Sequence, residues 1–314
     1  METLKKRFEK GNLTKVIMGL GNTFVEQITA LGAICSLAKA DIFDLTPDKK
    51  VFEAIRKGIL SQGLNPNDYL YCVSFSFGED VHGTKADIDK KECNHCKNCE
   101  KLCPYGAISD CKVSKEKCIG CGKCTVGNEC GAINYYKEIK NPIEELKKLS
   151  EYKIDMVELH VNGFDKKSIL EEVKKIKNTF PNIMIGLCMT YEKRDLTEVK
   201  EIIRETERII FPQKLIFQAD GKAMSGINND INSSLKSVKF AKELAGENTY
   251  IILSGGCNER TKELVKSENA KISGIGYGSY IRILTAPFVQ NSEFWCNIGI
   301  IEEAVERLNF FGKA

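Results

Sequence analysis

Short apolar runs alternate with amphipathic segments along most of this chain, at the lengths and periods of strands and helices. Three buried strands are predicted before residue 80, at 15–21, 41–45 and 69–77. Apolar residues recur at steps of three and four from Phe24 to Ala38, which predicts a helix between the first two strands. Thr46 is expected to cap the next helix with Pro47 at its first position, where the missing N–H is no loss.

The second half repeats the same unit five times. Its predicted strands lie at 155–162, 182–189, 214–221, 249–256 and 271–278. Helices are expected to start at Asn141, in capping-box style with Glu144, and at Asp195 and Asn258. Three strands and then five make eight βα units, which favour a (β/α)8 barrel over the alternative of an open, doubly wound sheet. The expected division is 1–80 for three barrel units, 81–140 for an insert after strand 3, and 141–314 for the rest of the barrel.

Composition and charge exclude several classes of protein. The chain has 314 residues, 42% hydrophobic and 28% charged, with a formal net charge of +3. That balance gives no reason to expect binding to nucleic acid or to a membrane surface. No run approaches the ~20 apolar residues of a membrane span. The first residues lack an apolar signal core, so we expect a cytoplasmic protein with reduced thiols.

Residues 81–140 carry two cysteine runs that predict iron–sulfur clusters. The first run has the spacing C-x2-C-x2-C-x3-C-P and the second C-x2-C-x2-C-x5-C. The first is the bacterial ferredoxin run, in which the fourth cysteine ligates the other cluster of a pair. Crossed pairing therefore assigns one [4Fe-4S] cluster to Cys93, Cys96, Cys99 and Cys130, and the other to Cys118, Cys121, Cys124 and Cys103. Zinc prefers two separated pairs of ligands, and disulfides need an oxidising compartment, so both alternatives fit less well.

The second run departs from the ferredoxin pattern. Five residues precede Cys130 and no proline follows it. With this longer gap, two alternatives stay open for the second cluster: it has only three irons, as [3Fe-4S], or it is labile. Cys111 lies between the runs, and it is interpreted as an ordinary thiol rather than as a spare ligand.

Chemistry in such barrels takes place at the carboxyl ends of the strands. Residues expected there are Asn22, Glu79, Asp80, His82, Glu158, His160, Asn162, Cys188, Tyr191, Gln218, Asp220, Lys222 and Asn258. Glu158 and His160 face the same way on one strand, so they are candidates for proton transfer, unless they form a structural polar layer. Asp220 and Lys222 are candidate substrate contacts, or alternatively a plain turn. His82 is expected to fix the junction with the insert.

Glycine-rich ends of strands 7 and 8 predict a phosphate site. Its candidate residues are Ser254, Gly255, Gly256, Gly276, Tyr277, Gly278 and Ser279, with a short helix at 279–287 whose N-terminus would face the anion. FMN or another phosphate-bearing ligand would fit, although strand 6 has no lysine at its core to face a flavin ring. Alternatively, the glycines only permit tight turns.

Several of these motifs occur in an order that resembles a known family. They are Gly78-Glu-Asp-x-His82, the two cysteine runs, Glu158-Leu-His160, Asp220-Gly-Lys-Ala-Met-Ser-Gly226, Ser254-Gly-Gly256 and Gly276-Tyr-Gly-Ser-Tyr280. The chain resembles the LdpA family, the cyanobacterial light-dependent-period iron–sulfur proteins. The resemblance covers most of residues 15–290. It implies a redox-active protein with two clusters, linked in cyanobacteria to the circadian clock.

Two functions follow as hypotheses. In the first, the chain is an oxidoreductase whose clusters relay electrons to a flavin or a phosphorylated small molecule in the barrel mouth. In the second, it is a redox sensor without turnover, whose cluster state changes its interaction with a protein partner. The sequence gives neither the substrate nor the partner, and it leaves the oligomeric state open.

Overall fold

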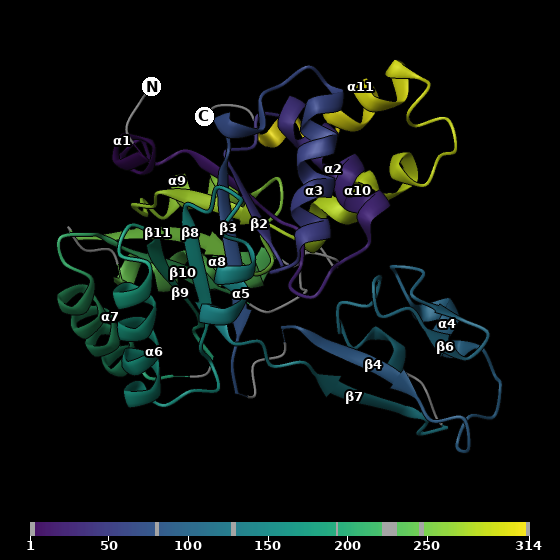
Figure 1. Ribbon diagram of the computed structural model, residues 1–314, viewed down its shortest axis with the longest axis horizontal. Coiled ribbons are helices and arrows are strands. Elements are labelled where there is room, and N and C mark those ends of the chain that lie inside the picture. The colour runs from purple at the N-terminus through teal and green to yellow at the C-terminus, as the bar shows by residue number, and fades with distance from the viewer. Residues whose placement is uncertain are drawn as a thin grey trace.

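The computed structural model describes residues 4–78, 82–126, 130–192, 194–221, 231–244 and 248–311. Eight parallel strands close into a barrel, which confirms the predicted fold and excludes the open sheet (Figure 1). In order around the barrel they are β1 (Leu13–Ile17), β12 (Gly274–Tyr277), β11 (Thr249–Ser254), β10 (Leu215–Asp220), β9 (Met184–Thr190), β8 (Met156–His160), β3 (Leu70–Ser76) and β2 (Ile42–Leu45).

Helices follow the strands and cover the outside of the barrel (Figure 1). They are α2 (Val25–Leu37), α3 (Lys49–Ser61), α5 (Pro142–Lys148), α6 (Lys166–Thr179), α7 (Leu196–Ile210), α8 (Ile231–Leu244), α9 (Thr261–Ser267) and α10 (Ser279–Val289). Outside these units lie α1 (Leu4–Glu9), η1 (Pro66–Asp68), α11 (Ile298–Glu306) and η4 (Asn309–Phe311). On α1, the ring of Phe8 stacks on Tyr250 with the ring centroids 4.9 Å apart, and both residues belong to the apolar cluster at the amino ends of the strands.

The start of α3 differs from the prediction. Asp48, rather than Thr46, is the N-cap, and its side chain accepts a hydrogen bond from the backbone N–H of Lys50. Pro47 therefore lies before the helix and not at its first position. The hydroxyl of Thr46 instead accepts a hydrogen bond from the N–H of Gly21, 3.2 Å away. Because it contacts the β1–α2 loop, this hydroxyl does not cap the helix.

The other predicted helix starts are confirmed with one exception. The side chains of Asn141 and Asp195 cap α5 and α7 as expected. Helix α10 begins at Ser279. Helix α9 begins at Thr261, three residues later than predicted, because Asn258 forms a turn in which its N–H donates to the hydroxyl of Thr261.

The interior of the barrel is layered. Side chains alternate in direction along a strand, so every second residue points inward. An apolar cluster lies at the amino ends of the strands and includes Leu13, Ile42, Leu70, Met156, Ile216 and Ile252. Two residues further along each strand the inward positions are Lys15, Asp44, Cys72, Glu158, Gln218 and Ser254, and all of them are buried. Interiors of such barrels are typically filled by bulky branched residues, so a polar layer here points to a specific role.

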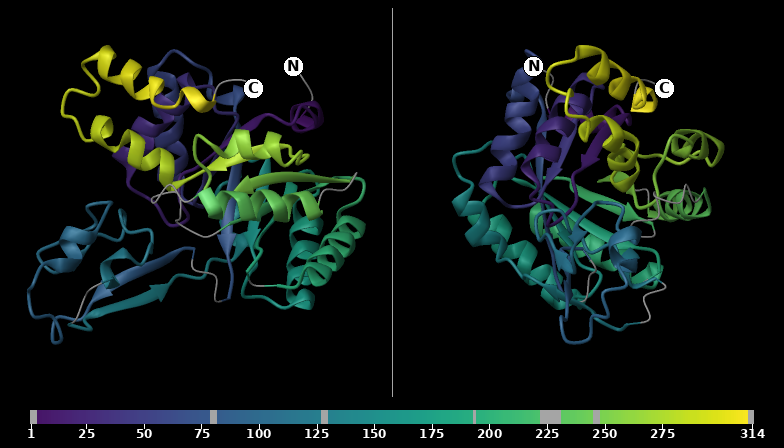
Figure 2. Two further views of the ribbon diagram at one scale, coloured as in Figure 1. Left: turned by 180° about the vertical axis from the view of Figure 1, so that it is seen from behind. Right: turned by 90° about the vertical axis from the view of Figure 1, so that its right-hand side faces the viewer.

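The segment between β3 and α5 lies outside the barrel. It contains β4 (Thr84–Ile88), α4 (Asn98–Leu102), β5 (Ile108–Ser109), β6 (Lys112–Val113), η2 (Lys123–Thr125) and β7 (Ile133–Lys137). Strands β4 and β7 pair in antiparallel register, with Thr84 opposite Lys137. Figures 1 and 2 show this ribbon and the loops at its far end extending away from the barrel.

Candidate functional site

Four side chains form a connected polar layer across the middle of the barrel. The Lys15 ammonium nitrogen lies 2.6 Å from Glu158 Oε2, 2.9 Å from Asp44 Oδ2 and 2.7 Å from Gln218 Oε1. Asp44 also accepts a hydrogen bond from the hydroxyl of Ser74. Because all of these groups are buried, their charges are compensated by one another and not by water.

The charges in this layer shift one another's protonation. Burial alone would lower the pKa of Lys15, but the Asp44 and Glu158 carboxylates raise it well above its usual value. Burial would raise the pKa of Glu158, yet Lys15 and His160 lower it to about 2. The pKa of Asp44 is raised, first by burial and then by the charge of Glu158, which Lys15 only partly offsets. Lys15 and Glu158 therefore both stay charged at neutral pH.

Two histidines extend this layer toward the mouth of the barrel. His160 Nε2 lies 3.3 Å from Glu158 Oε1, as the shared strand face predicted. The rings of His82 and His160 are 4.4 Å apart at their centroids. His82 also lines the same cavity as His160, and its expected role at the junction with the insert stays a prediction. The arrangement therefore links the mouth to the buried Lys15–Glu158 pair.

A cavity opens at the carboxyl ends of the strands. About 70 Å³ of it is open to the centres of water-sized molecules, and a single water needs roughly 10–15 Å³ on this measure. Residues of four kinds line it: the histidines, polar strand ends, glycine loops and a few apolar or basic side chains. They are Ile17, Gly19, Leu20, Asp44, Ser74, His82, Ile119, His160, Gln218, Asp220, Ser254, Gly255, Gly256, Cys257, Gly276, Gly278, Ser279 and Arg282. The described walls leave room for a small ligand.

Glycine is required at the β11 end of this cavity. Gly255 and Gly256 have φ values of +68° and +86°, a region that favours glycine. A Cβ at Gly255 would also lie 2.5 Å from Asp220 Oδ1 and 2.4 Å from the backbone nitrogen of Gly221. Asp220 accepts a hydrogen bond from the hydroxyl of Ser254, 2.8 Å away. The sequence therefore packs these two loops against each other and leaves their backbone at the cavity wall.

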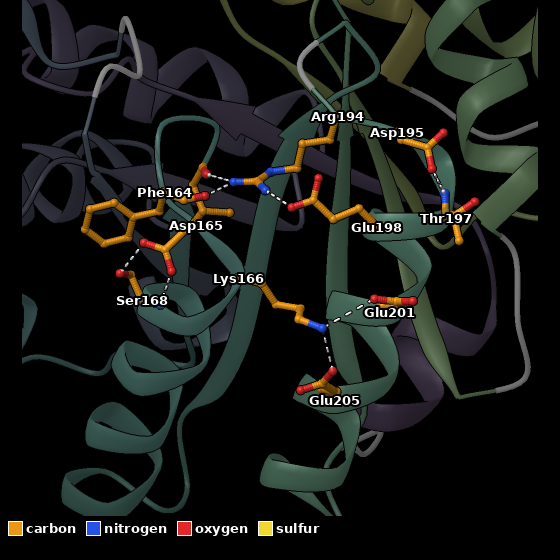
Figure 3. Close-up of polar contacts among 11 residues, drawn as sticks. Phe164, Asp165, Lys166, Ser168, Arg194, Asp195, Thr197, Glu198, Glu201 and Glu205 are labelled. Carbon is orange, nitrogen blue, oxygen red and sulfur yellow. Dashed lines mark hydrogen bonds and ion pairs between the residues drawn. The ribbon is translucent and has the colours of Figure 1, made fainter.

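Loops after β8 and β9 are fixed by polar contacts on the same face of the barrel, as Figure 3 shows. The side chain of Asp165 caps α6 through the N–H of Ser168. Arg194 donates to the carbonyl oxygen of Phe164 and to the carboxylate of Glu198. These contacts tie the two loops to each other and give the mouth a rigid rim.

The cysteines of the two runs gather along the β4–β7 ribbon, where Ala86 and Ile88 of β4 and Ile133 of β7 pack with most of them. Six of them belong to one packed cluster, in which Cys99, Cys118 and Cys124 are buried, whereas Cys96 is exposed and is not one of the six. Backbone N–H groups of Ala86 and Ala107 point at sulfurs, 3.3 Å from Cys118 Sγ and 3.2 Å from Cys103 Sγ. Amide donors aimed at thiolate sulfurs are what an iron–sulfur cluster uses to stabilise its charge. The residues present thus fit such a group.

The thiols of the two runs raise one another's pKa values. Burial raises the pKa of Cys121, and the thiols of Cys103, Cys124 and Cys118 add to that shift. Burial likewise raises the pKa of Cys99, with smaller contributions from Cys93, Cys124 and Cys96. Cys103, from the first run, therefore lies close to the sulfurs of the second run.

One of the cysteine loops packs directly on the barrel. Lys85 donates to the carbonyl oxygens of Gly21, Lys115 and Cys118, the last at 2.8 Å. The next residue after Cys118 is Ile119, which lines the mouth cavity. The second cysteine run is therefore the one adjacent to the barrel mouth.

Cys111 lies against the first run. Its sulfur is 3.3 Å from His95 Nδ1, and one ligand atom from each of Cys93, His95 and Cys111 can be found within 4.8 Å of the others. Cys111 has a φ of +57°, in the turn between β5 and β6. The interpretation of Cys111 as an ordinary thiol stays a prediction, although its position is close to the ligands.

Other predicted site residues have structural partners. Asn162 accepts from the backbone N–H of Thr190 at 2.9 Å, and Cys188 accepts from the Gln218 amide at 3.3 Å. Tyr191 packs against Phe240. The Tyr277 ring packs on Phe310 and Phe311 and so points away from the mouth, which leaves only its backbone at the predicted phosphate site. Asn22 donates to the carbonyl of Met18. Glu79, Asp80 and Lys222 lie outside the described residues.

Sequence reasoning missed three residues of the site. Lys15 and Asp44 each interrupt an apolar strand, and that interruption was the available signal for a buried polar layer. Arg282 lies in the first turn of α10, three residues beyond the Gly-Tyr-Gly-Ser motif, and it lines the cavity.

The barrel and the cysteine loops define the class of protein. A family model for the 4Fe-4S binding domain matches residues 86–109, so this is an iron–sulfur protein that includes an α/β barrel. A second model, for the Light dependent period A C-terminal domain, matches residues 148–308. The chain belongs to the light dependent period A (LdpA) family, which confirms the resemblance found in its sequence.

Known proteins support both the family and the fold. Light dependent period A of Synechococcus elongatus is 25% identical over 301 residues, which cover 90% of this chain and 83% of that protein. Among solved structures, the YdjI aldolase of Escherichia coli K12 superposes with a TM-score of 0.51 at 8% identity, covering 97% of this chain and 90% of that chain. At that identity the likeness concerns the fold alone. None of the helices in the described ranges has the length and apolar character that a membrane crossing requires.

Proposed function

We propose that this protein carries two [4Fe-4S] clusters, in a module formed by residues 81–140, and relays electrons to a small molecule bound in the barrel mouth. Cys93, Cys96, Cys99 and Cys130 would hold the outer cluster. Cys118, Cys121, Cys124 and Cys103 would hold the inner one. When bound, these clusters supply one-electron transfer. The observation that carries the proposal is the position of Ile119, which follows Cys118 directly and lines the cavity that also contains His160 and Asp220.

The two cysteine loops differ in exposure to solvent, as the entry and exit points of an electron-transfer path would. Cys96 is exposed, so the outer loop is accessible to an electron donor or acceptor. Cys118 is buried where its loop packs on the barrel, and the three carbonyl contacts of Lys85 fix that loop in place. Electrons would therefore enter at the solvent side and leave at the mouth.

Proton transfer in the mouth would use the histidine pair. His160 contacts Glu158, whose pKa of about 2 keeps the carboxylate charged, and the ring of His82 lies over His160. The His160 imidazole thus lies between the ligand cavity and a charged carboxylate, and we propose that it exchanges a proton with the bound ligand.

The ligand we propose is small and bears a phosphate group. Backbone of Gly255, Gly256, Gly276 and Gly278 faces the cavity, and α10 starts at Ser279 without a side-chain cap. The first N–H groups of a helix lack intrahelical partners and attract anions. FMN is the larger candidate for the same place, and it would need more room than the described walls enclose.

Anaerobic purification followed by iron analysis and electron paramagnetic resonance tests this proposal. We expect close to eight irons per chain and two cluster signals. Cys118→Ser and Cys103→Ser should remove the same signal, whereas Cys111→Ser should leave both signals in place. Fewer than six irons per chain after reconstitution would contradict two clusters, and loss of different signals in the two variants would contradict crossed ligation. Bound flavin released by acid would favour FMN as the ligand.

A redox sensor is the second candidate. The exposed loop around Cys96 and membership in the light dependent period A family favour it. A sensor would bind a protein partner differently in its oxidised and reduced states and would keep that difference when His160 is replaced by Gln. A relay enzyme would lose turnover in the same variant.

A further inference from the structure

Arg282 is a buried cation at the wall of the mouth cavity. It lies in the first turn of α10, and only 4% of its surface is exposed. Its Nη1 donates to the carbonyl oxygen of Ile17 at 2.6 Å. Its guanidinium carbon lies 5.7 Å from the centre of the Tyr105 ring. The side chain is thus held between the end of β1 and the cysteine-rich segment.

The charge of Arg282 has no carboxylate to balance it among the residues the structure describes, where no Asp or Glu lies within 4.0 Å of the guanidinium. Its Nε is also buried without a hydrogen-bond partner in those ranges. The carboxylates that line the cavity have other contacts, since Asp44 pairs with Lys15 and Asp220 accepts from Ser254. A buried charge that these residues leave without a counter-charge is costly, so an anion bound beside it would stabilise the protein.

Two glycines lie against the Arg282 guanidinium at the wall of the mouth cavity. Gly278 is the N-cap of α10, and a Cβ there would be 3.9 Å from Arg282 Nη1. A Cβ at Gly19 would be 3.4 Å from the same nitrogen. Both positions carry glycine, so the guanidinium, the start of the helix and the open backbone face one space. Guanidinium groups and helix N-termini are the groups that proteins use to bind phosphate.

We propose that Arg282 binds the phosphate group of the mouth ligand and couples its occupancy to the redox state of the inner cluster through Tyr105. This rests on the proposed function, because Tyr105 lies two residues from Cys103, which we assign to the inner cluster. The positive charge of Arg282 beside this loop stabilises the reduced cluster, which carries one more negative charge. A bound phosphate neutralises that charge and lowers the midpoint potential. By reciprocity, phosphate binds more tightly to the oxidised protein.

The test uses the full-length, cluster-loaded protein and inorganic phosphate as the probe. Calorimetry measures binding, and a redox titration followed by electron paramagnetic resonance measures the inner-cluster potential with and without phosphate. We expect one phosphate per chain and a lower potential in its presence. A tenfold preference for the oxidised protein corresponds to about 59 mV for a one-electron couple.

Variants separate binding from coupling. Arg282→Gln should weaken phosphate binding at least tenfold, and Arg282→Lys should weaken it less, because the charge stays while the planar fork is lost. Arg307→Gln, at the exposed arginine that directly follows α11 and pairs with Glu303, is the matched control and should bind like the wild type. Tyr105→Leu should bind phosphate but show a smaller potential shift, whereas Tyr105→Phe should keep the shift.

Three results would overturn the inference. Unchanged phosphate binding in Arg282→Gln, with wild-type iron content, excludes Arg282 as the anchor. Binding that leaves the potential unchanged excludes the coupling. A potential shift that persists fully in Tyr105→Leu excludes Tyr105 as its route. A different result would show that the proposed function, and not this inference, is wrong. In that case Cys103→Ser would leave the inner-cluster signal in place, while phosphate would still bind to Arg282.

Discussion

Replacing Lys15 with methionine removes the ammonium group that neutralises two buried carboxylates. Asp44 and Glu158 are 3% and 0% exposed, and they lie 2.9 and 2.6 Å from the Lys15 nitrogen. Removing one partner from a buried ion pair typically costs about 3–5 kcal/mol, because the other charge is left without compensation. Methionine has a similar length and fills most of the space, so the loss is mainly electrostatic.

The size of the effect can be worked out for neutral pH. One carboxylate can escape the penalty by taking up a proton, and Asp44 is the candidate because its pKa is already raised. We therefore expect a loss of about 4 kcal/mol in the free energy of unfolding. At ~2 °C per kcal/mol for a chain of this size, the midpoint of thermal unfolding should fall by about 8 °C.

The dependence on pH distinguishes this explanation from a packing defect. Without Lys15, burial is the largest influence on both carboxylates, and we expect their pKa values to lie above those in the unfolded chain. The variant should then gain stability as pH falls and lose it as pH rises through the folded-state values. The difference from the wild type should therefore be smaller at pH 5 than at pH 8. A cavity left by poor packing would give a difference that is the same at both pH values.

Circular dichroism at 222 nm under anaerobic conditions provides the assay, with cluster absorbance followed separately. Lys49→Met is the matched control, because Lys49 pairs with Glu151 while both side chains are more than half exposed, and its midpoint should equal that of the wild type. Adding Glu158→Gln to Lys15→Met should restore part of the loss. A midpoint for Lys15→Met within 2 °C of the wild type at pH 8 would refute the ion-pair layer.

Three further predictions follow from the same contacts. The pKa of Glu158 is about 2 in the folded protein, so its ionised carboxylate stabilises the fold above pH ~4.5 and this stabilisation is lost as pH falls toward 2. In Glu158→Gln, the free energy of unfolding, measured with denaturant, should therefore fall by about 3 kcal/mol less than in the wild type over that pH range. Gly58→Ala should cost about 1–3 kcal/mol in the same measurement, because its Cβ would lie 2.0 Å from the carbonyl oxygen of Thr29 where α3 crosses α2. Lys85→Met should speed amide hydrogen exchange at residues 115–120 more than tenfold with little change in circular dichroism, and unchanged exchange there would show that its three carbonyl contacts do not hold the loop.

Much of the fold could be predicted from the sequence because it depends on local patterns. Each of the eight strands is an apolar run, and all eight predicted runs overlap strands of the closed barrel. The N-cap of α3 was harder to predict, because Thr46 and Asp48 are both suitable residue types. The hydroxyl of Thr46 accepts a hydrogen bond from Gly21, which precedes it by 25 residues, so Asp48 caps the helix. That contact exists only once β1 and β2 lie side by side.

Predicting the site was harder for the same reason. Glu158 and His160 share a strand face, so their proximity follows from the period of a strand. Lys15 meets Glu158 across 143 residues, and this pairing requires the closed barrel. Arg282 and Tyr105 are far apart in the sequence and meet where the cysteine-rich segment, tied by Lys85 to Gly21, packs on the barrel. No short motif encodes these contacts.

The antiparallel pairing of β4 with β7 has a consequence for how the barrel folds. Strands β3 and β8 are neighbours in the barrel, yet roughly 80 residues separate Ser76 from Met156, and a long loop must close before they can pair. Once β4 and β7 are joined, the effective loop shortens to roughly 30 residues, which lowers the entropic cost of closure by about 1 kcal/mol. Loading of iron into the cysteine loops would hold that ribbon together. The metal supply of the cell would then influence how quickly each newly made barrel closes.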